Sequence, residues 1–246
     1  YMERYLQQPR HIEIQVIADH YGHAVHLGER DCSSQRRHQK VVEESPAPHI
    51  TKAERQKIGQ ACVNACQYMG FRGVGTFEFL YENGEFFFIE MNTRIQVEHP
   101  VTELVTGIDL ISEQIKVAAG FELGFSQADI VLQGHALECR INAEHPFTFM
   151  PSAGKVNYCH LPGGNGVRVD SHIESGYLIP THYDNLIAKV CVHAKTRDLA
   201  LQKMQSALHE LTVTGIMTNK ALHQHFLADP GFQAGGTSIH YLSQWL

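Results

Sequence analysis

The chain has 246 residues, 43% of them hydrophobic and 19% charged, and carries a formal net charge of −6 at pH 7. This composition is typical of a globular protein with one large core or two small ones, and it argues against overall disorder. The lack of an apolar run of about 18 residues and the negative charge argue against a membrane-spanning helix and a general nucleic-acid surface, so neither partner is expected.

The first quarter of the chain predicts a hairpin, a loop and a helix. Apolar and polar residues alternate over 11–19 and again over 24–29, which is typical of two paired strands. The charged segment 31–49 contains prolines and is expected to form a long irregular loop. A capping-box spacing at Thr51 predicts a helix that runs to about Gly70.

The strongest local signal is Asn83-Gly84, which separates two aromatic-rich, β-prone segments at 75–83 and 85–92. An Asn-Gly pair between such segments predicts a β-hairpin, because both residues tolerate the positive φ angles of a tight turn.

Helices are predicted near 98–105 and 110–119, and the pattern lapses around 122–130, which marks a candidate domain boundary. Beyond it strands come first and helices last, which favours an α+β fold for this part. The predicted strands lie near 134–141, 155–160, 167–169 and 186–192, and the predicted helices near 198–211 and 219–227.

Three oxygen donors lie on the predicted hairpin. Glu78 and Glu90 are on opposite arms, and Asn92 shares a strand face with Glu90. A two-residue turn would place residue 78 opposite residue 89, with the carboxylates on opposite faces, whereas a three-residue loop with Gly84 in the left-handed conformation would place both on one face. The second geometry could hold Mg²⁺ bridging nucleotide phosphates. Two solvent-facing glutamates are the alternative.

A second polar cluster follows directly. Arg94, Gln96 and Glu98 alternate with apolar residues, so an extended segment would direct all three into one space. Arginine offers a planar fork for an oxyanion, glutamine a hydrogen bond and glutamate a base, although an amphipathic edge strand is the alternative. The run 35–40 adds cationic and amide groups, which by themselves could form a nucleic-acid patch; the acidic residues at 43–44 argue against that.

Other motifs are missing. There is no GxxxxGK[ST] and no GxGxxG after a strand, so neither common phosphate-binding loop is predicted. The glycine run at 163–166 is interpreted as a turn. Six scattered cysteines without CxxC or zinc-site spacing favour a reduced, cytoplasmic protein.

Three segments resemble the biotin carboxylase component of biotin-dependent carboxylases, which are members of the ATP-grasp superfamily. They are Cys32–Glu44 (CSSQRRHQKVVEE), Phe88–Pro100 (FIEMNTRIQVEHP) and Glu138–Glu144 (ECRINAE). The resemblance implies an α+β protein with the C-terminal half of an ATP-grasp domain at 1–125, which carries the ATP, metal and bicarbonate site. The biotin carboxylase C-terminal domain would follow at 126–246.

The resemblance also implies a role for each matching residue. The metal ligands would be Glu78, Glu90 and Asn92. The adenosine of ATP would lie near Glu3, Leu6, His11, Gln35 and His38, with Leu80, Ile89 and Ile239 as apolar neighbours. Bicarbonate would bind Lys40, Arg94, Gln96 and the backbone of Val97. Glu98 would deprotonate bicarbonate, and Arg140 with Arg94 would stabilise the biotin enolate.

The implied reaction is the carboxylation of biotin on a carrier protein with ATP, bicarbonate and Mg²⁺ or Mn²⁺, through carboxyphosphate. It is the first half-reaction of acetyl-CoA carboxylase. The implied partners are the biotin carboxyl carrier protein, the carboxyltransferase subunits and a second copy of the enzyme.

Family members carry an N-terminal domain and a glycine-rich lid before the segment where this sequence begins. The 246-residue chain alone is therefore expected to bind ATP weakly and to turn it over negligibly. Two alternatives remain. One is another ATP-grasp carboxylate ligase, such as a carbamoyl-phosphate or purine-pathway enzyme, and the other is a non-catalytic fragment or scaffold.

Overall fold

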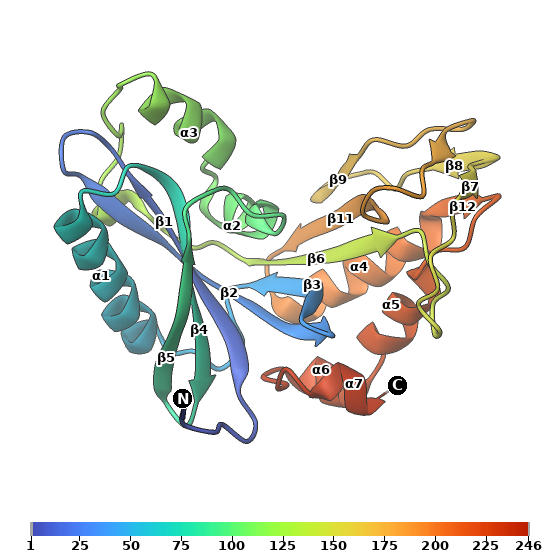
Figure 1. Cartoon of the computed structure of the whole chain (residues 1–246), viewed down its shortest axis with the longest axis horizontal. Coiled ribbons are helices and arrows are strands. Elements are labelled where there is room, and N and C mark those ends of the chain that lie inside the picture. The colour runs from blue at the N-terminus through green and yellow to red at the C-terminus, as the bar shows by residue number, and fades with distance from the viewer. Residues whose placement is uncertain (1, 246) are drawn as a thin grey trace.

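The structure is a computed structural model that describes residues 2–245. One antiparallel sheet of eight strands runs through it, in the order β5-β4-β1-β2-β3-β6-β11-β9 (Figure 1). In chain order these strands are β1 (Arg10–Ala18), β2 (Ala24–Arg36), β3 (Gln39–Ser45), β4 (Gly73–Glu82), β5 (Glu85–Asn92), β6 (His135–Asn142), β9 (Val167–Ser171) and β11 (Leu186–Ala194).

Helices cover the two ends of this sheet. One helix, α1, packs on β1 and β2, and another, α4, packs on β6 and β11 (Figure 1). The helices are α1 (Lys52–Met69), α2 (His99–Thr106), α3 (Leu110–Ala118), α4 (Arg197–Glu210), α5 (Lys220–Leu227), α6 (Pro230–Ala234) and α7 (Tyr241–Trp245), with a short 3-10 helix, η1 (Gln127–Asp129). Within residues 2–245, no helix has the length and apolar character needed to cross a membrane.

Two small sheets lie apart from the large one. One pairs β7 (Gly154–Lys155) with β10 (Leu178–Ile179), and the other pairs β8 (Tyr158–His160) with β12 (Thr212–Thr214). The single strand expected over 155–160 is thus divided between two sheets.

Apolar and polar residues alternate along β1, and the strand therefore has one apolar face and one polar face, both of them buried. On β1, Ile14 and Val16 join the hydrophobic cluster that packs against α1. Their neighbours Glu13 and Gln15 are fully buried too, but they face the opposite side of the sheet, because successive side chains of a strand alternate.

The same arrangement recurs on β6. Its apolar residues Leu137, Cys139 and Ile141 belong to the large core under α4, whereas Glu138 and Arg140 face the opposite side. The sheet therefore has a polar inner face that is shielded from water, and buried charges on such a face require partners.

Several predicted boundaries are confirmed. The capping box at the start of α1 is complete, since the Thr51 hydroxyl accepts from the Glu54 N–H at 3.2 Å and the Glu54 carboxylate accepts from the Thr51 N–H at 2.8 Å. The helix ends at Gly70, which adopts the left-handed conformation with φ 63°.

The segment 31–49 is not the long irregular loop expected from its charge and its prolines. β2 continues to Arg36, and β3 begins at Gln39, after a two-residue turn in which Arg37 and His38 have φ angles of 49° and 64°. Charge suggested a solvated loop, but Asp31 and Glu43 are buried and pair with Arg10 on β1 and Arg140 on β6.

The Asn83-Gly84 hairpin is confirmed, but its expected three-residue loop is wrong. Glu82 pairs with Glu85 across a two-residue turn, in which Asn83 and Gly84 both have positive φ. A β-bulge then shifts the register: Phe79 pairs with Phe88, and Glu78 pairs with Glu90, so Ile89 is the extra residue. The bulge, and not the turn, brings the two carboxylates to the same face.

The approach to β6 depends on a glycine. Gly134 has a φ of +69°, and a Cβ there would lie 2.3 Å from the backbone oxygen of Ala194. We expect Gly134→Ala to lower the free energy of unfolding by about 3 kcal/mol or more, because the clash adds to the strain of a left-handed residue. Gly22→Ala is the matched control, with φ +89° and open space around it, and should cost only about 1–2 kcal/mol. Urea denaturation measures both, and equal losses would contradict the steric explanation.

Candidate active site

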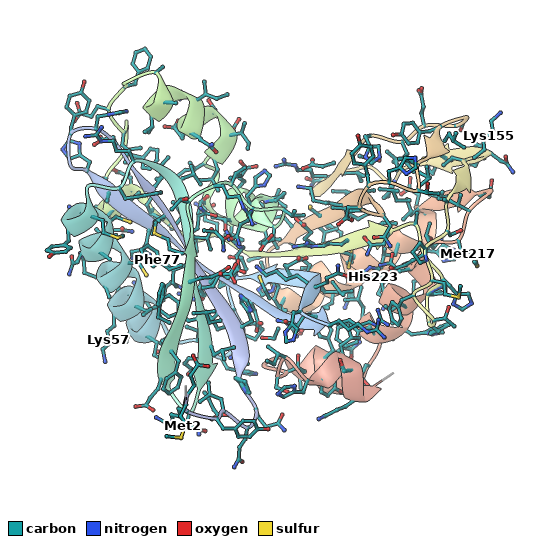
Figure 2. The ribbon with its side chains drawn as sticks, in the orientation of Figure 1. Met2, Lys57, Phe77, Lys155, Met217 and His223 are labelled. Atoms are coloured by element: carbon teal, nitrogen blue, oxygen red, sulfur yellow. The ribbon has the colours of Figure 1, made fainter. Side chains whose placement is uncertain are left out.

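A cavity of about 640 Å³ opens on the polar face of the sheet. Its walls come from β1, β2, β3, β4, β5, β6, β11 and the segment before α2, where side-chain nitrogen and oxygen atoms gather in the middle of the molecule (Figure 2). The structure brings nearly all of the predicted site residues together here: His11, Gln35, His38, Lys40, Glu78, Leu80, Ile89, Glu90, Asn92, Arg94, Gln96, Val97, Glu98, Arg140 and Ile239.

Two predicted residues do not line this cavity. Glu3 is exposed and Leu6 is buried, and both lie in the segment before β1. By contrast, Gln39, Asn142, Asp184, Asn185 and Leu186 line the cavity without having been predicted. The last four residues lie where β6 ends and β11 begins, a proximity set by strand pairing that spacing along the chain cannot reveal.

Lys40 is the centre of the charge network. Its ammonium group donates to carboxylates of Glu13, Glu78 at 3.1 Å and Glu98 at 2.6 Å. Burial acts to lower the pKa of Lys40, but the three carboxylates outweigh it and hold that pKa well above its ordinary value. The site therefore contains a permanent positive charge.

Arg30 on β2 is a fully buried arginine that no sequence motif indicated. The Arg30 guanidinium donates to Glu13 at 2.9 and 3.1 Å and to the Gln96 side-chain oxygen at 2.9 Å. It also donates to Gln15, Thr76 and Thr102. The sequence did contain a signal for this arginine, which is Glu13 within the otherwise apolar β1. A glutamate in a buried strand requires a cation as its partner.

Glu98 lies between two cations. One oxygen accepts from Lys40, and the other accepts from the Arg140 Nη2 at 3.0 Å. Arg140 in turn donates from Nε to Glu43 at 2.5 Å. Because Glu98 is only 2% exposed, both of its oxygens are oriented by the protein.

The expected extended geometry of residues 94–98 is wrong. The chain turns at 97–98 into α2, so Gln96 and Glu98 are buried while Arg94 is exposed and donates to its neighbour, the Ile95 carbonyl. Gln96 instead bridges the network, with its amide nitrogen 2.7 Å from Glu78. Arg94 still lines the cavity, but from the solvent side.

The three predicted metal ligands converge. The Asn92 amide nitrogen donates to an oxygen of Glu78 and to an oxygen of Glu90, each at 3.0 Å, so the three side chains are in contact. An amide binds a metal ion through its oxygen, so the Asn92 amide would turn to become a ligand. Two carboxylates and an amide from adjacent strands fit a divalent cation that favours oxygen ligands. Glu78 is buried and Glu90 is exposed.

His11 on β1 lies beside Glu78 and Glu13. Its Nε2 lies 3.0 Å from Glu78 and 3.2 Å from Glu13. Burial acts to lower the pKa of His11, but the two carboxylates raise it to about 9, so the imidazole is charged at neutral pH. Gln35 lies beside it and donates to the Cys32 carbonyl at 3.1 Å.

Comparison with known families gives two matches along the chain. Residues 1–125 match the family described as carbamoyl-phosphate synthase L chain, ATP binding domain, and residues 138–244 match the biotin carboxylase C-terminal domain. The biotin carboxylase of Haemophilus influenzae is 62% identical over 246 residues, which are 100% of this chain and 55% of that protein. One pyruvate carboxylase subunit, from Methanothermobacter thermautotrophicus, is 49% identical over 100% of this chain and 50% of its own length. The chain thus spans about half the length of the curated relatives it matches.

Solved structures agree with these sequence matches. The biotin carboxylase domain of Hydrogenobacter thermophilus 2-oxoglutarate carboxylase, in complex with MgADP, ADP and bicarbonate, superposes with a TM-score of 0.96. It is 45% identical, and the match covers 98% of this chain and 54% of that one. Campylobacter jejuni biotin carboxylase in its β,γ-ATP complex gives the same TM-score at 47% identity, with 98% and 54% covered.

The buried Arg30 allows a direct test of the charge balance. We expect Arg30→Met to lower the free energy of unfolding by about 3–5 kcal/mol, because it leaves Glu13 less compensated in the interior. Adding Glu13→Gln should recover part of that loss. Arg4→Met is the control: Arg4 pairs with Glu85 on the exposed surface, and such pairs contribute about 0–1 kcal/mol. Chemical denaturation measures all of these variants against the wild type, and a double variant no more stable than Arg30→Met would contradict the explanation.

Proposed function

The chain belongs to the biotin carboxylase family, and on that premise we propose that it is part of an enzyme that carboxylates carrier-bound biotin with ATP and bicarbonate. The observation that carries the proposal is the position of Glu98 between Lys40 and Arg140, on the wall of a cavity that also presents the Glu78 and Glu90 pair. A base beside two fixed cations suits an anionic substrate that must lose a proton.

The family resemblance suggests each proposed role, and the geometry of the network supports it. Bicarbonate would bind Lys40, Arg94, Gln96 and the Val97 backbone, and Glu98 would take its proton. The freed oxygen would then attack the γ-phosphate of ATP, with ADP leaving, to give carboxyphosphate. Phosphoryl transfer requires positioning and charge neutralisation more than covalent catalysis by the protein, which this network of fixed charges supports.

Glu78, Glu90 and Asn92 would hold Mg²⁺ or Mn²⁺, which would neutralise phosphate charge when bound. His11, Gln35 and His38, with the apolar Leu80, Ile89 and Ile239, would face the adenosine. Glu3 and Leu6 are also proposed to lie near the nucleotide. They do not line the cavity, so they would contact a part of the nucleotide that extends beyond it.

Carboxyphosphate would split into CO₂ and phosphate, and the phosphate would accept the ureido N–H proton of biotin. Arg140, with Arg94, would stabilise the resulting enolate, and the ureido nitrogen would then capture the CO₂. A guanidinium stabilises such a developing negative charge best when it is fixed in advance. The contacts of Arg140 with Glu43 and Glu98 support that role.

We also propose a division into 1–125, the C-terminal half of an ATP-grasp domain, and 126–246, the biotin carboxylase C-terminal domain. The family matches to 1–125 and 138–244 support it. The large sheet continues across this division, since β3 pairs with β6. The second match also favours a biotin carboxylase over a carbamoyl-phosphate or purine-pathway ligase.

For the final acceptor we propose acetyl-CoA, through a separate carboxyltransferase, with a biotin carboxyl carrier protein as the immediate partner and a homodimer as the assembly. The higher identity to the Haemophilus biotin carboxylase than to the pyruvate carboxylase subunit supports a biotin carboxylase subunit over a pyruvate carboxylase subunit, and the acetyl-CoA acceptor follows from the family resemblance alone.

Lys40→Ala separates bicarbonate binding from nucleotide binding. Loss of the ammonium should raise the KM for bicarbonate by about tenfold or more while changing ATP affinity by less than about threefold, since Lys40 donates to the proposed base Glu98 and contacts the nucleotide site only through Glu78. Lys57→Ala, an exposed α1 substitution, is the control (Figure 2). Steady-state kinetics of the complete enzyme measure these values, and equal losses for both substrates would contradict the assignment.

Biotin-dependent and bicarbonate-dependent ATP cleavage tests the function as a whole. We expect the complete enzyme to show both dependences, and the 246-residue chain alone to show negligible turnover, because family members place further phosphate-binding residues in their other half. ATP cleavage that ignores biotin would favour another ATP-grasp ligase, and full turnover by the chain alone would show that the other half is dispensable.

A further inference from the structure

Two glutamates face each other inside the sheet. Glu43 on β3 is the direct register partner of Glu138 on β6, and both side chains are fully buried. Residues opposite each other in an antiparallel pair have Cβ atoms about 4.5–5.5 Å apart, and like charges in such pairs are destabilising. This pair lies on the polar face, where Glu138 is two residues from Arg140.

In each of the two glutamates one carboxylate oxygen has a hydrogen-bond partner and the other has none. One Glu43 oxygen accepts from the Arg140 Nε at 2.5 Å, and one Glu138 oxygen lies 3.3 Å from the Cys191 Sγ, which donates to it. The second oxygen of each acid, Oε2 of Glu43 and Oε1 of Glu138, is buried without a hydrogen-bond partner. Two ionised carboxylates cannot satisfy each other, because neither has a donor.

The nearby cations are already engaged. Lys40 on β3 serves Glu13, Glu78 and Glu98. Lys189 on β11 contacts Asp170 at 3.1 Å and donates to the Val97 carbonyl at 2.9 Å. Arg140 on β6 is shared between Glu43 and Glu98, so no further cation of the described residues contacts Glu138.

We propose that Glu43 and Glu138 share one proton, and that Glu43 is thereby a positioning residue that fixes the Arg140 guanidinium while its Nη2 remains on Glu98. The proton gives each unpartnered oxygen a partner and reduces the charge of the pair to a single negative charge. The catalytic part of this inference rests on the proposed function; the shared proton does not.

The direction of the titration agrees with the geometry. Burial, reinforced by Glu43, raises the pKa of Glu138 well above its ordinary value. Burial and the nearby Glu98 raise the pKa of Glu43 to about 7 against the opposing effect of Arg140. Glu138 is therefore the member that holds the proton at neutral pH, and Glu43, which accepts from Arg140, is the member that loses its proton first as pH rises.

The pH dependence of stability tests the proton in this chain. An acid whose folded pKa is raised binds its proton more tightly in the folded state, so its contribution to stability decreases as pH rises above the unfolded pKa. Glutamine cannot titrate. We therefore expect the urea midpoint of Glu138→Gln to rise relative to wild type between about pH 5 and pH 8.

Glu44→Gln is the matched control. Glu44 is buried next along β3, but it accepts from His135 and Arg197, and, despite its burial, these contacts hold its pKa below the ordinary value. Because this pKa lies below the range tested, the titration of Glu44 itself adds no pH dependence, and the change with pH should be much smaller in Glu44→Gln than in Glu138→Gln. Infrared spectra at neutral pH should show a protonated carboxylic acid band that is lost in Glu138→Gln and kept in Glu44→Gln. A constant difference for Glu138→Gln, or a band that it keeps, would overturn the shared proton.

The positioning role is tested in the complete enzyme. We expect Glu43→Gln to lower kcat for biotin carboxylation by about tenfold or more with little change in the KM for ATP, because Arg140 loses its charged acceptor. Glu138→Gln should lower kcat far less at neutral pH, since glutamine resembles the protonated acid. Equal losses in the two variants would overturn the positioning role. If the wild-type enzyme itself did not carboxylate biotin, the proposed function would fail, while the stability and infrared measurements would still decide the shared proton.

Discussion

The structure depends on the pairing of buried carboxylates with buried cations on one face of the sheet. Glu13 and Glu98 have almost no exposure, and they remain compatible with a folded interior only because Arg30, Lys40 and Arg140 lie against them. Removing one member of such a pair is far more costly than never having formed it. The same network therefore maintains the fold and holds the groups that we propose as base and anion-binding residues.

This network connects the two parts of the chain. Lys40 and Glu43 lie on β3, Arg140 lies on the adjacent β6, and backbone pairing between these strands sets their separation. Helix α5 and its N-cap residue add a second support, since His223, labelled in Figure 2, contacts the Arg140 carbonyl at 2.7 Å and Asn219 donates to it at 3.0 Å. Side chains held by strands and by neighbouring hydrogen bonds are placed more accurately than side chains on loops.

Local signals in the sequence were sufficient for elements whose cause is local. The capping box at Thr51 and the Asn83-Gly84 turn depend on residues a few positions apart, and both are present. The segment 31–49 was mistaken for a loop because its charges find partners on strands far away in sequence. Arg30 was missed for the same reason. Most residues of the candidate site were found through a family resemblance, because tertiary pairing, which periodicity does not encode, brings them together.

The bulge at Ile89 makes the alignment of Glu78 with Glu90 independent of the apolar side chain at position 89. Ile89 is the unpaired residue, so the facing of Glu78 and Glu90 does not depend on which side chain it carries. Its own side chain lines the cavity wall, as does that of Leu80. A substitution at this position would thus reshape the apolar surface of the cavity while Glu78 and Glu90 kept their alignment across the two strands.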